Sequence, residues 1–137
     1  MRYYLDTNIL IYFLYERESL QHDVFELIED NSNLLYVSSI AVKELIHLYK
    51  SKKINTRLYK NAKDIIKAIE IASIEIVPVN KFHLLQYAEL EIVPEHNDPN
   101  DHIIISQAIS DKIPIISSDR TFKKYVGQGL QFIFNRR

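Results

Sequence analysis

Five short, mostly apolar runs alternate along the chain with longer segments of helical periodicity, and this alternation limits the possible folds more than any other feature. The runs are residues 3–5, 34–37, 74–77, 113–116 and 130–134. Because their apolar residues follow one another without strict alternation, they are typical of strands buried on both faces. The pattern predicts an α/β fold with a central parallel sheet of about five strands and helices on both faces.

The segments between the runs predict the helices and their caps. Thr7 or Asn8 is a candidate N-cap of the first helix, and Ser38 or Ser39 of another. The predicted helices are a first one through Phe13, then about 20–29, one from the Ser38–Ser39 pair to about Lys50, 56–72, one from Asn80 to Leu90, 98–109, and a short one holding Phe122 and Tyr125.

The composition bounds the domain count and excludes several kinds of chemistry. With 137 residues, of which 47% are hydrophobic, we expect one domain, 1–137, with a full core. The absence of cysteine excludes disulfides, thiolate zinc sites and cysteine nucleophiles, and it fits a reducing cytoplasm. Two glycines are too few for a phosphate-binding loop or a dinucleotide fingerprint. A net charge of −1 gives no overall attraction for nucleic acid, so any such binding needs a local basic patch.

The N-terminal residues have a basic start and an apolar run, which raises the question of a leader or membrane span. Asp6 and Asn8 interrupt the run, and no small-residue cleavage site follows it. We therefore expect neither a signal peptide nor a membrane span.

Carboxylates follow two of the predicted strands. Asp6 comes directly after the first strand, and Asp119 follows the 113–116 strand by a few residues. The carboxyl ends of parallel strands lie at one edge of a sheet, and open α/β sheets bind their ligands there. Both side chains are therefore expected at one crevice.

Further acids are predicted at the same edge, at the starts of helices. Glu44 lies near the start of one helix, and Asp98-Pro99-Asn100-Asp101 begins another, with Pro99 suited to the first helical position. Each acid alone has an ordinary structural explanation, as a cap, a turn residue or a solvated charge. Several carboxylates in one crevice destabilise the fold by mutual repulsion unless a cation neutralises them.

Hard oxygen ligands without thiolate favour Mg²⁺ or Mn²⁺. An ion held in this way activates water and stabilises a phosphoryl transition state, so the pattern predicts phosphodiester hydrolysis with one or two ions. A phosphotransferase or a phospho-acceptor module that uses Asp6 as nucleophile is the alternative. Haloacid-dehalogenase-like enzymes need a second aspartate two residues on, where this chain has Asn8, and a phospho-acceptor needs neither Glu44 nor Asp119.

Four short motifs resemble those of the PIN-domain nucleases, in the same order along the chain. They are Asp6-Thr7-Asn8-Ile9-Leu10, Ser38-Ser39 with Glu44-Leu45, Asp98-Pro99-Asn100-Asp101 with Ile105-Ser106-Gln107-Ala108, and Ile115-Ile116-Ser117-Ser118-Asp119. The resemblance covers about residues 3–119, and Ser106 stands where the family often has alanine.

The resemblance implies a PIN-like three-layer fold and an acidic site that cleaves RNA with Mg²⁺ or Mn²⁺. The family's four acids match Asp6, Glu44, Asp101 and Asp119, and Asp98 matches an extra acid found in a subset. The compact chain is similar to VapC-type toxins, which are held by a cognate antitoxin and usually form homodimers. The alternatives are a PIN nuclease of RNA processing without a toxin role, and a degenerate PIN fold that only binds RNA.

Two further groups of residues are candidates for ligand contacts. His96 and His102 flank the acidic turn. On a helix His102 lies roughly 100° from its neighbour Asp101, so the side chains of His102 and Asp101 cannot easily face one ion. Basic residues cluster once, in the segment 50–67, where Lys60, Lys63 and Lys67 share one face of the predicted helix 56–72. These lysines either contact RNA phosphates or form an ordinary solvated face.

Overall fold

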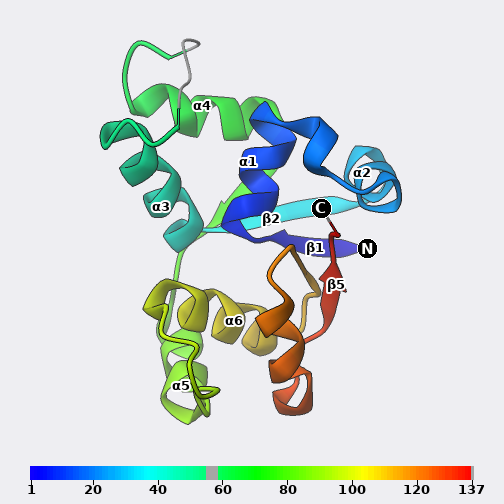
Figure 1. Cartoon of the computed structure of the whole chain (residues 1–137), viewed down its shortest axis with the longest axis vertical. Coiled ribbons are helices and arrows are strands. Elements are labelled where there is room, and N and C mark those ends of the chain that lie inside the picture. Colours follow the sequence, from blue (N-terminus) through cyan, green and yellow to red (C-terminus); the bar gives the residue numbers. More distant parts are fainter. Residues whose placement is uncertain (55–58, 137) are drawn as a thin grey trace.

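The computed structural model describes residues 1–54 and 59–136, and it is built on a five-stranded, all-parallel sheet (Figure 1). The strand order is β3-β2-β1-β4-β5. The strands are β1 Arg2–Leu5, β2 Leu34–Ser38, β3 Ile74–Val77, β4 Ile115–Ser117 and β5 Phe132–Phe134. All four strand pairs are parallel, as the runs of consecutive apolar residues predict.

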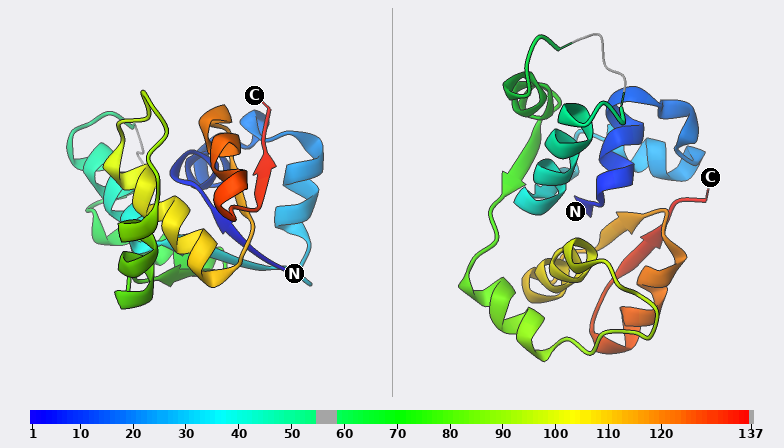
Figure 2. Two further views of the ribbon diagram at one scale, coloured as in Figure 1. Left: turned by 90° about the horizontal axis from the view of Figure 1, so that it is seen from below. Right: turned by 60° about the vertical axis from the view of Figure 1, so that its left-hand side comes forward.

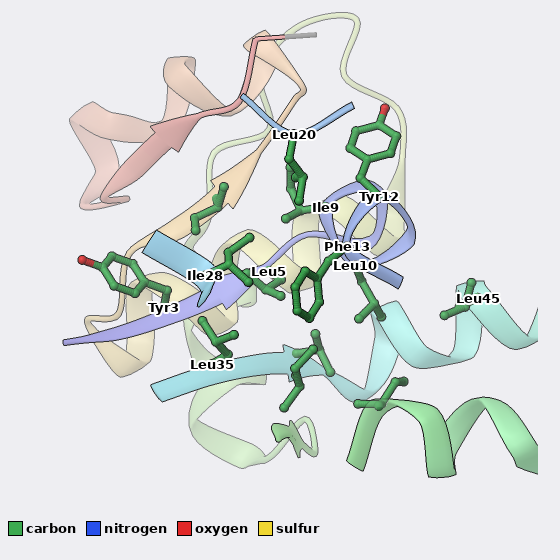
Figure 3. Close-up of a cluster of buried hydrophobic side chains, with 14 of the residues drawn as sticks. Tyr3, Leu5, Ile9, Leu10, Tyr12, Phe13, Leu20, Ile28, Leu35 and Leu45 are labelled. Carbon is green, nitrogen blue, oxygen red and sulfur yellow. The ribbon is translucent and has the colours of Figure 1, made fainter. Parts of the chain in front are cut away.

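Successive residues of the central strands point to opposite faces of the sheet, and both faces are buried. Tyr3 and Leu5 of β1 enter one hydrophobic cluster, while Tyr4 enters the other. The first cluster packs α1, α2, α3 and α4 against the sheet (Figure 3), and the second packs α5, α6 and the 3-10 helix η2 against the opposite face. The views in Figure 2 show the same division into three layers.

Most of the helices, α4 excepted, begin and end within a few residues of the predicted positions. Their bounds are α1 Thr7–Tyr15, α2 His22–Glu29, α3 Ser39–Lys50, α4 Lys63–Ile71, α5 Lys81–Glu89 and α6 Pro99–Asp111, with the 3-10 helices η1 Arg17–Ser19 and η2 Arg120–Gln128. Ser38 caps α3, and Asn80 caps α5 through a capping box with His83. In the part of the chain that the structure describes, no helix combines the length and the hydropathy needed to cross a membrane.

Several boundaries differ from the sequence prediction, and β4 and β5 each begin two residues later than the predicted strands 113–116 and 130–134. Asp6, not Thr7 or Asn8, caps α1, because its Oδ1 accepts the Thr7 N–H at 2.8 Å. The predicted helix 20–29 begins only at His22, because Leu20 and Gln21 before it are extended. The predicted helix 56–72 begins only at Lys63, and residues 55–58 lie outside the described part.

The sheet order reverses between β1 and β4, and this reversal determines where a ligand site can form. The chain builds β1, β2 and β3 outward in one direction and then returns to add β4 and β5 on the other side of β1. Ligands of open α/β sheets bind at such a switch point, outside the carboxyl ends of the strands. Asp6 directly follows β1. Ser117 is the last residue of β4, and Ser118 and Asp119 follow it. Both motifs therefore lie at the switch point.

Candidate active site

Asp6 is the buried centre of the acidic crevice. Its side chain is 4% exposed, and each of its oxygens accepts a hydrogen bond: Oδ1 from the Thr7 N–H at 2.8 Å and Oδ2 from the Ser117 hydroxyl at 2.7 Å. The Ser117 hydroxyl oxygen also accepts the Asp119 N–H at 3.0 Å. Ser117 therefore joins the end of β1 to the end of β4 and fixes two acids relative to each other.

These two hydrogen bonds also bear on the alternative in which Asp6 is a nucleophile toward a phosphoryl group. An oxygen that attacks phosphorus needs open access and freedom to approach the substrate. The carboxyl of Asp6 is buried and held at both oxygens. Its surroundings suit a fixed ligand better than an attacking group.

Glu44 and Asp119 are two further acids whose hydrogen bonds connect them to the ends of β1 and β4. Glu44 lies one turn into α3, and its Oε1 accepts the Thr7 hydroxyl at 2.9 Å. Asp119 caps η2, with Oδ1 accepting the Thr121 N–H at 2.9 Å, so its second oxygen is free of this cap contact. Each acid is thus held by a neighbour that constrains one oxygen.

Asp98 and Asp101 come from the start of α6, which is the first turn of a largely buried helix. Asp98 is the N-cap, and its Oδ1 accepts the N–H groups of Asn100 at 3.0 Å and Asp101 at 3.5 Å. The predicted cap is therefore present, and Asp98 is exposed at the rim while Asp101 is partly buried. The helix N-terminus favours negative charge at both positions.

The five acids act on one another electrostatically, which is evidence that the fold brings them together. Burial and the charge of Asp101 raise the pKa of Asp6 to about 7. Burial, with the charges of Asp98, Glu44 and Asp119, raises the pKa of Asp101 to about 7. The pKa of Glu44 is also raised, chiefly by burial. Two carboxyls that titrate near neutral pH are typical of functional sites.

Little positive charge compensates these acids among the described residues. Lys43 lowers the pKa of Glu44, and its Nζ donates to Asn100 Oδ1 at 3.3 Å. None of the salt bridges formed by described residues joins a lysine or arginine to any of the five acids. An all-carboxylate donor set with uncompensated charge fits a hard divalent cation.

His96 also lies beside the acids; from the sequence it was only a candidate for ligand contacts. Its Nε2 is 3.2 Å from Asp101 Oδ2, and His96, Asp101 and Asp119 each bring one possible ligand atom within 4.8 Å of the others. His96 precedes α6, so the helical angle that separates Asp101 from His102 does not apply to it. His102 points away, as predicted, and its Nε2 donates to the His96 carbonyl oxygen at 2.7 Å.

The predicted basic segment has a less direct relation to the crevice. Lys63 and Lys67 lie on α4, Lys60 precedes it, and all three are exposed. No hydrogen bond or ion pair found for the described residues connects them to the acids. A hollow of about 480 Å³ lies beside one of the acids, Glu44, and it is also lined by Lys43, His47, Leu48 and Asn100.

Comparison with known families identifies the family of the chain. The sequence profile of the PIN domain matches residues 3–128. The chain belongs to the PIN-domain family. The predicted resemblance, the three-layer fold and the parallel sheet are thereby confirmed, and the family assigns the PIN-domain nuclease class.

Solved structures resemble this PIN domain over nearly its whole length. VapBC2 from Rickettsia felis, bound to a promoter DNA fragment, has 24% sequence identity and a TM-score of 0.70, with 98% of this chain and 99% of that chain covered. VapBC-1 from nontypeable Haemophilus influenzae has 24% identity and a TM-score of 0.67, with 98% of each chain covered. VapBC-5 from Mycobacterium tuberculosis has 19% identity and a TM-score of 0.60, covering 99% and 98%. No curated protein sequence matches the chain.

The raised pKa values of the PIN domain's acids predict how its metal-free stability depends on pH. Asp6 and Asp101 have a pKa of about 7 in the fold, above the ordinary value of 3.8, so the folded state binds more protons than the unfolded state between these values. Stability of the metal-free protein should therefore fall as the pH rises from about 5 to about 8. Thermal melts in chelator check this, and Asp6→Asn should flatten the dependence. A melting temperature that rises over this range would contradict the assignment.

Proposed function

We propose that the chain is a metal-dependent endoribonuclease that hydrolyses phosphodiester bonds in RNA. Asp6, Glu44, Asp101 and Asp119 hold Mg²⁺ or Mn²⁺, and Asp98 is an auxiliary acid at the rim. The observation that carries the proposal is the burial of Asp6 and Asp101 beside other acids, which raises the pKa of both to about 7. Such a cluster destabilises the fold when no cation is bound, and it provides the oxygen ligands that a hard cation needs.

The protein's own residues hold the ligand oxygens in place. Ser117 and the Thr7 N–H fix the carboxyl of Asp6, and the Thr7 hydroxyl fixes Glu44. When bound, the metal supplies water activation and stabilises charge on the phosphoryl oxygens. Fixed carboxylates keep the geometry of such a site without reorganisation during the reaction.

The hollow beside Glu44 supports a polynucleotide substrate. Lys43 and His47 lie one turn apart on α3, and Asn100 faces them from α6. This arrangement offers a cation and amide donors next to the acids, where a neighbouring phosphate or ribose of the substrate would lie. Lys60, Lys63 and Lys67 are proposed as more distant phosphate contacts that offset the acidic crevice.

A toxin role is the favoured biological setting, because the solved structures that resemble the chain are VapBC toxin–antitoxin complexes. The proposed partners are a cognate antitoxin protein and a second copy of the chain in a homodimer. A PIN nuclease of RNA processing is the alternative. Induction in a bacterial host separates them: the wild type should arrest growth and Asp6→Asn should not, whereas growth at the normal rate with active nuclease would favour processing.

The nuclease proposal predicts that cleavage depends on both the cation and the acids. Purified wild-type protein should cut RNA with Mg²⁺ or Mn²⁺ and stop when EDTA is added. Asp6→Asn and Asp101→Asn should retain the fold and lose at least about a hundredfold in rate, since each removes a charged ligand. Cleavage products on a denaturing gel and circular dichroism are measured together. Equal cutting in EDTA, or full activity in either variant, would reject the mechanism.

The lysine proposal predicts an effect on binding without an effect on chemistry. Neutralising Lys60, Lys63 and Lys67 together to glutamine should weaken RNA binding and reduce its dependence on salt, since each phosphate contact contributes about 0.7 to the salt slope for single strands. The cleavage rate at saturating RNA should stay the same. Titrations at several salt concentrations measure this, with Lys112→Gln on the turn after α6 as a control. Unchanged affinity and an unchanged salt slope would show that these lysines form an ordinary solvated face and do not contact RNA.

A further inference from the structure

His96 is held in one orientation by the short segment between α5 and α6. The His96 N–H donates to the Val93 carbonyl at 3.1 Å and closes a turn in which Glu95 has a φ of 72°. A non-glycine residue adopts this left-handed conformation only where the surroundings stabilise it. The turn places His96 inside the protein, where it is 7% exposed and its ring lies beside the carboxyl of Asp101.

Aromatic rings and a hydrogen bond to the backbone fix the ring further. The rings of His102, Phe122 and Tyr125 lie around it, with centroids 4.7, 6.4 and 5.4 Å away. His102 also donates to the His96 carbonyl oxygen. The two ring nitrogens therefore have fixed partners: Nδ1 meets the Tyr125 hydroxyl at 2.7 Å, and Nε2 meets Asp101 Oδ2 at 3.2 Å.

The hydroxyl of Tyr125 decides which ring nitrogen carries the proton. Tyr125 is fully buried, and its oxygen already accepts the Val93 N–H at 3.1 Å. Its own proton then has the His96 Nδ1 as its acceptor. If Nδ1 were protonated instead, the buried hydroxyl proton would lose this partner, and an unpaired buried donor is costly. The neutral ring is therefore protonated at Nε2 and donates to Asp101.

We infer that His96 is a positioning residue for Asp101 and not a ligand of the metal. This inference rests on the proposed nuclease function. A chain of donors runs from the Val93 N–H through Tyr125 and His96 to Asp101 Oδ2, and it leaves the other carboxylate oxygen of Asp101 to face the ion. Although His96, Asp101 and Asp119 lie close enough to share an ion, Nε2 has no free lone pair in this arrangement. The metal is then bound by oxygen alone, as hard cations prefer.

The direct test is pulsed electron paramagnetic resonance of wild-type protein loaded with Mn²⁺. The inference predicts no coupling of the size that a directly bound imidazole nitrogen gives. A strong ¹⁴N coupling would make His96 a ligand and overturn the inference, while the nuclease proposal would stand. If the wild type binds no Mn²⁺ at all, both the inference and the proposed function fail.

Calorimetric titration with Mn²⁺ separates positioning from a merely structural role. His96→Leu should weaken Mn²⁺ binding by about tenfold or more, as losses of outer partners of metal ligands do. His96→Gln, which keeps an N–H donor at a similar reach, should recover most of the affinity. Tyr125→Phe keeps the ring but loses the hydroxyl, and it should also weaken binding. Equal affinity in His96→Leu and the wild type would overturn the inference, as would a His96→Gln protein that folds and binds no better than His96→Leu.

Discussion

The burial of the Asp6 carboxyl at the adjacent carboxyl ends of β1 and β4 is the constraint on which the rest of the site depends. The sheet order reverses there, so the ends of two neighbouring strands provide a crevice without any large insertion. Asp6 is held by the Thr7 N–H and by Ser117, and Ser117 in turn receives the Asp119 N–H. Ser117 therefore fixes the position of Asp119 relative to Asp6.

The acidic crevice is destabilising by itself, and the two hydrophobic clusters offset its cost. Leu10 and Ile116 on one face of the sheet and Ile105 and Ile115 on the other are fully buried. Burial of apolar side chains stabilises a fold by about 25 cal/mol per Å². A well-packed sheet can therefore tolerate buried carboxyls whose pKa values are raised toward neutrality. Active sites often lower the stability of a fold in this way.

Much of the fold was predictable because its signals are local. The consecutive apolar runs identified a parallel sheet, and Asn80 and Asp98 were recognisable as helix caps from their own neighbourhoods. The acids at the strand ends and helix starts followed from the same argument. The PIN-domain match confirms the family, whereas the roles of the individual acids stay predictions.

The parts that sequence reasoning missed depend on contacts between distant segments. Asp6 caps its own helix while binding Ser117, which is 111 positions away along the chain. His96 reaches Asp101 only because Glu95 adopts a left-handed turn and Tyr125, 29 positions further on, fixes the ring. No periodicity or spacing contains such information. The presence of a histidine five residues before an expected ligand, in a segment outside the helix, was the one available signal.

The central claim is that the buried acids form a cation site whose carboxyls bind protons when no metal is present. Calorimetric titration with Mn²⁺ in buffers of different ionisation enthalpy measures the protons released per ion. Because Asp6 and Asp101 have pKa values of about 7, binding at about pH 6 should release about one to two protons, and the release should fall toward zero by about pH 8.5. Absence of binding, or binding with a proton release that does not change with pH, would contradict the account.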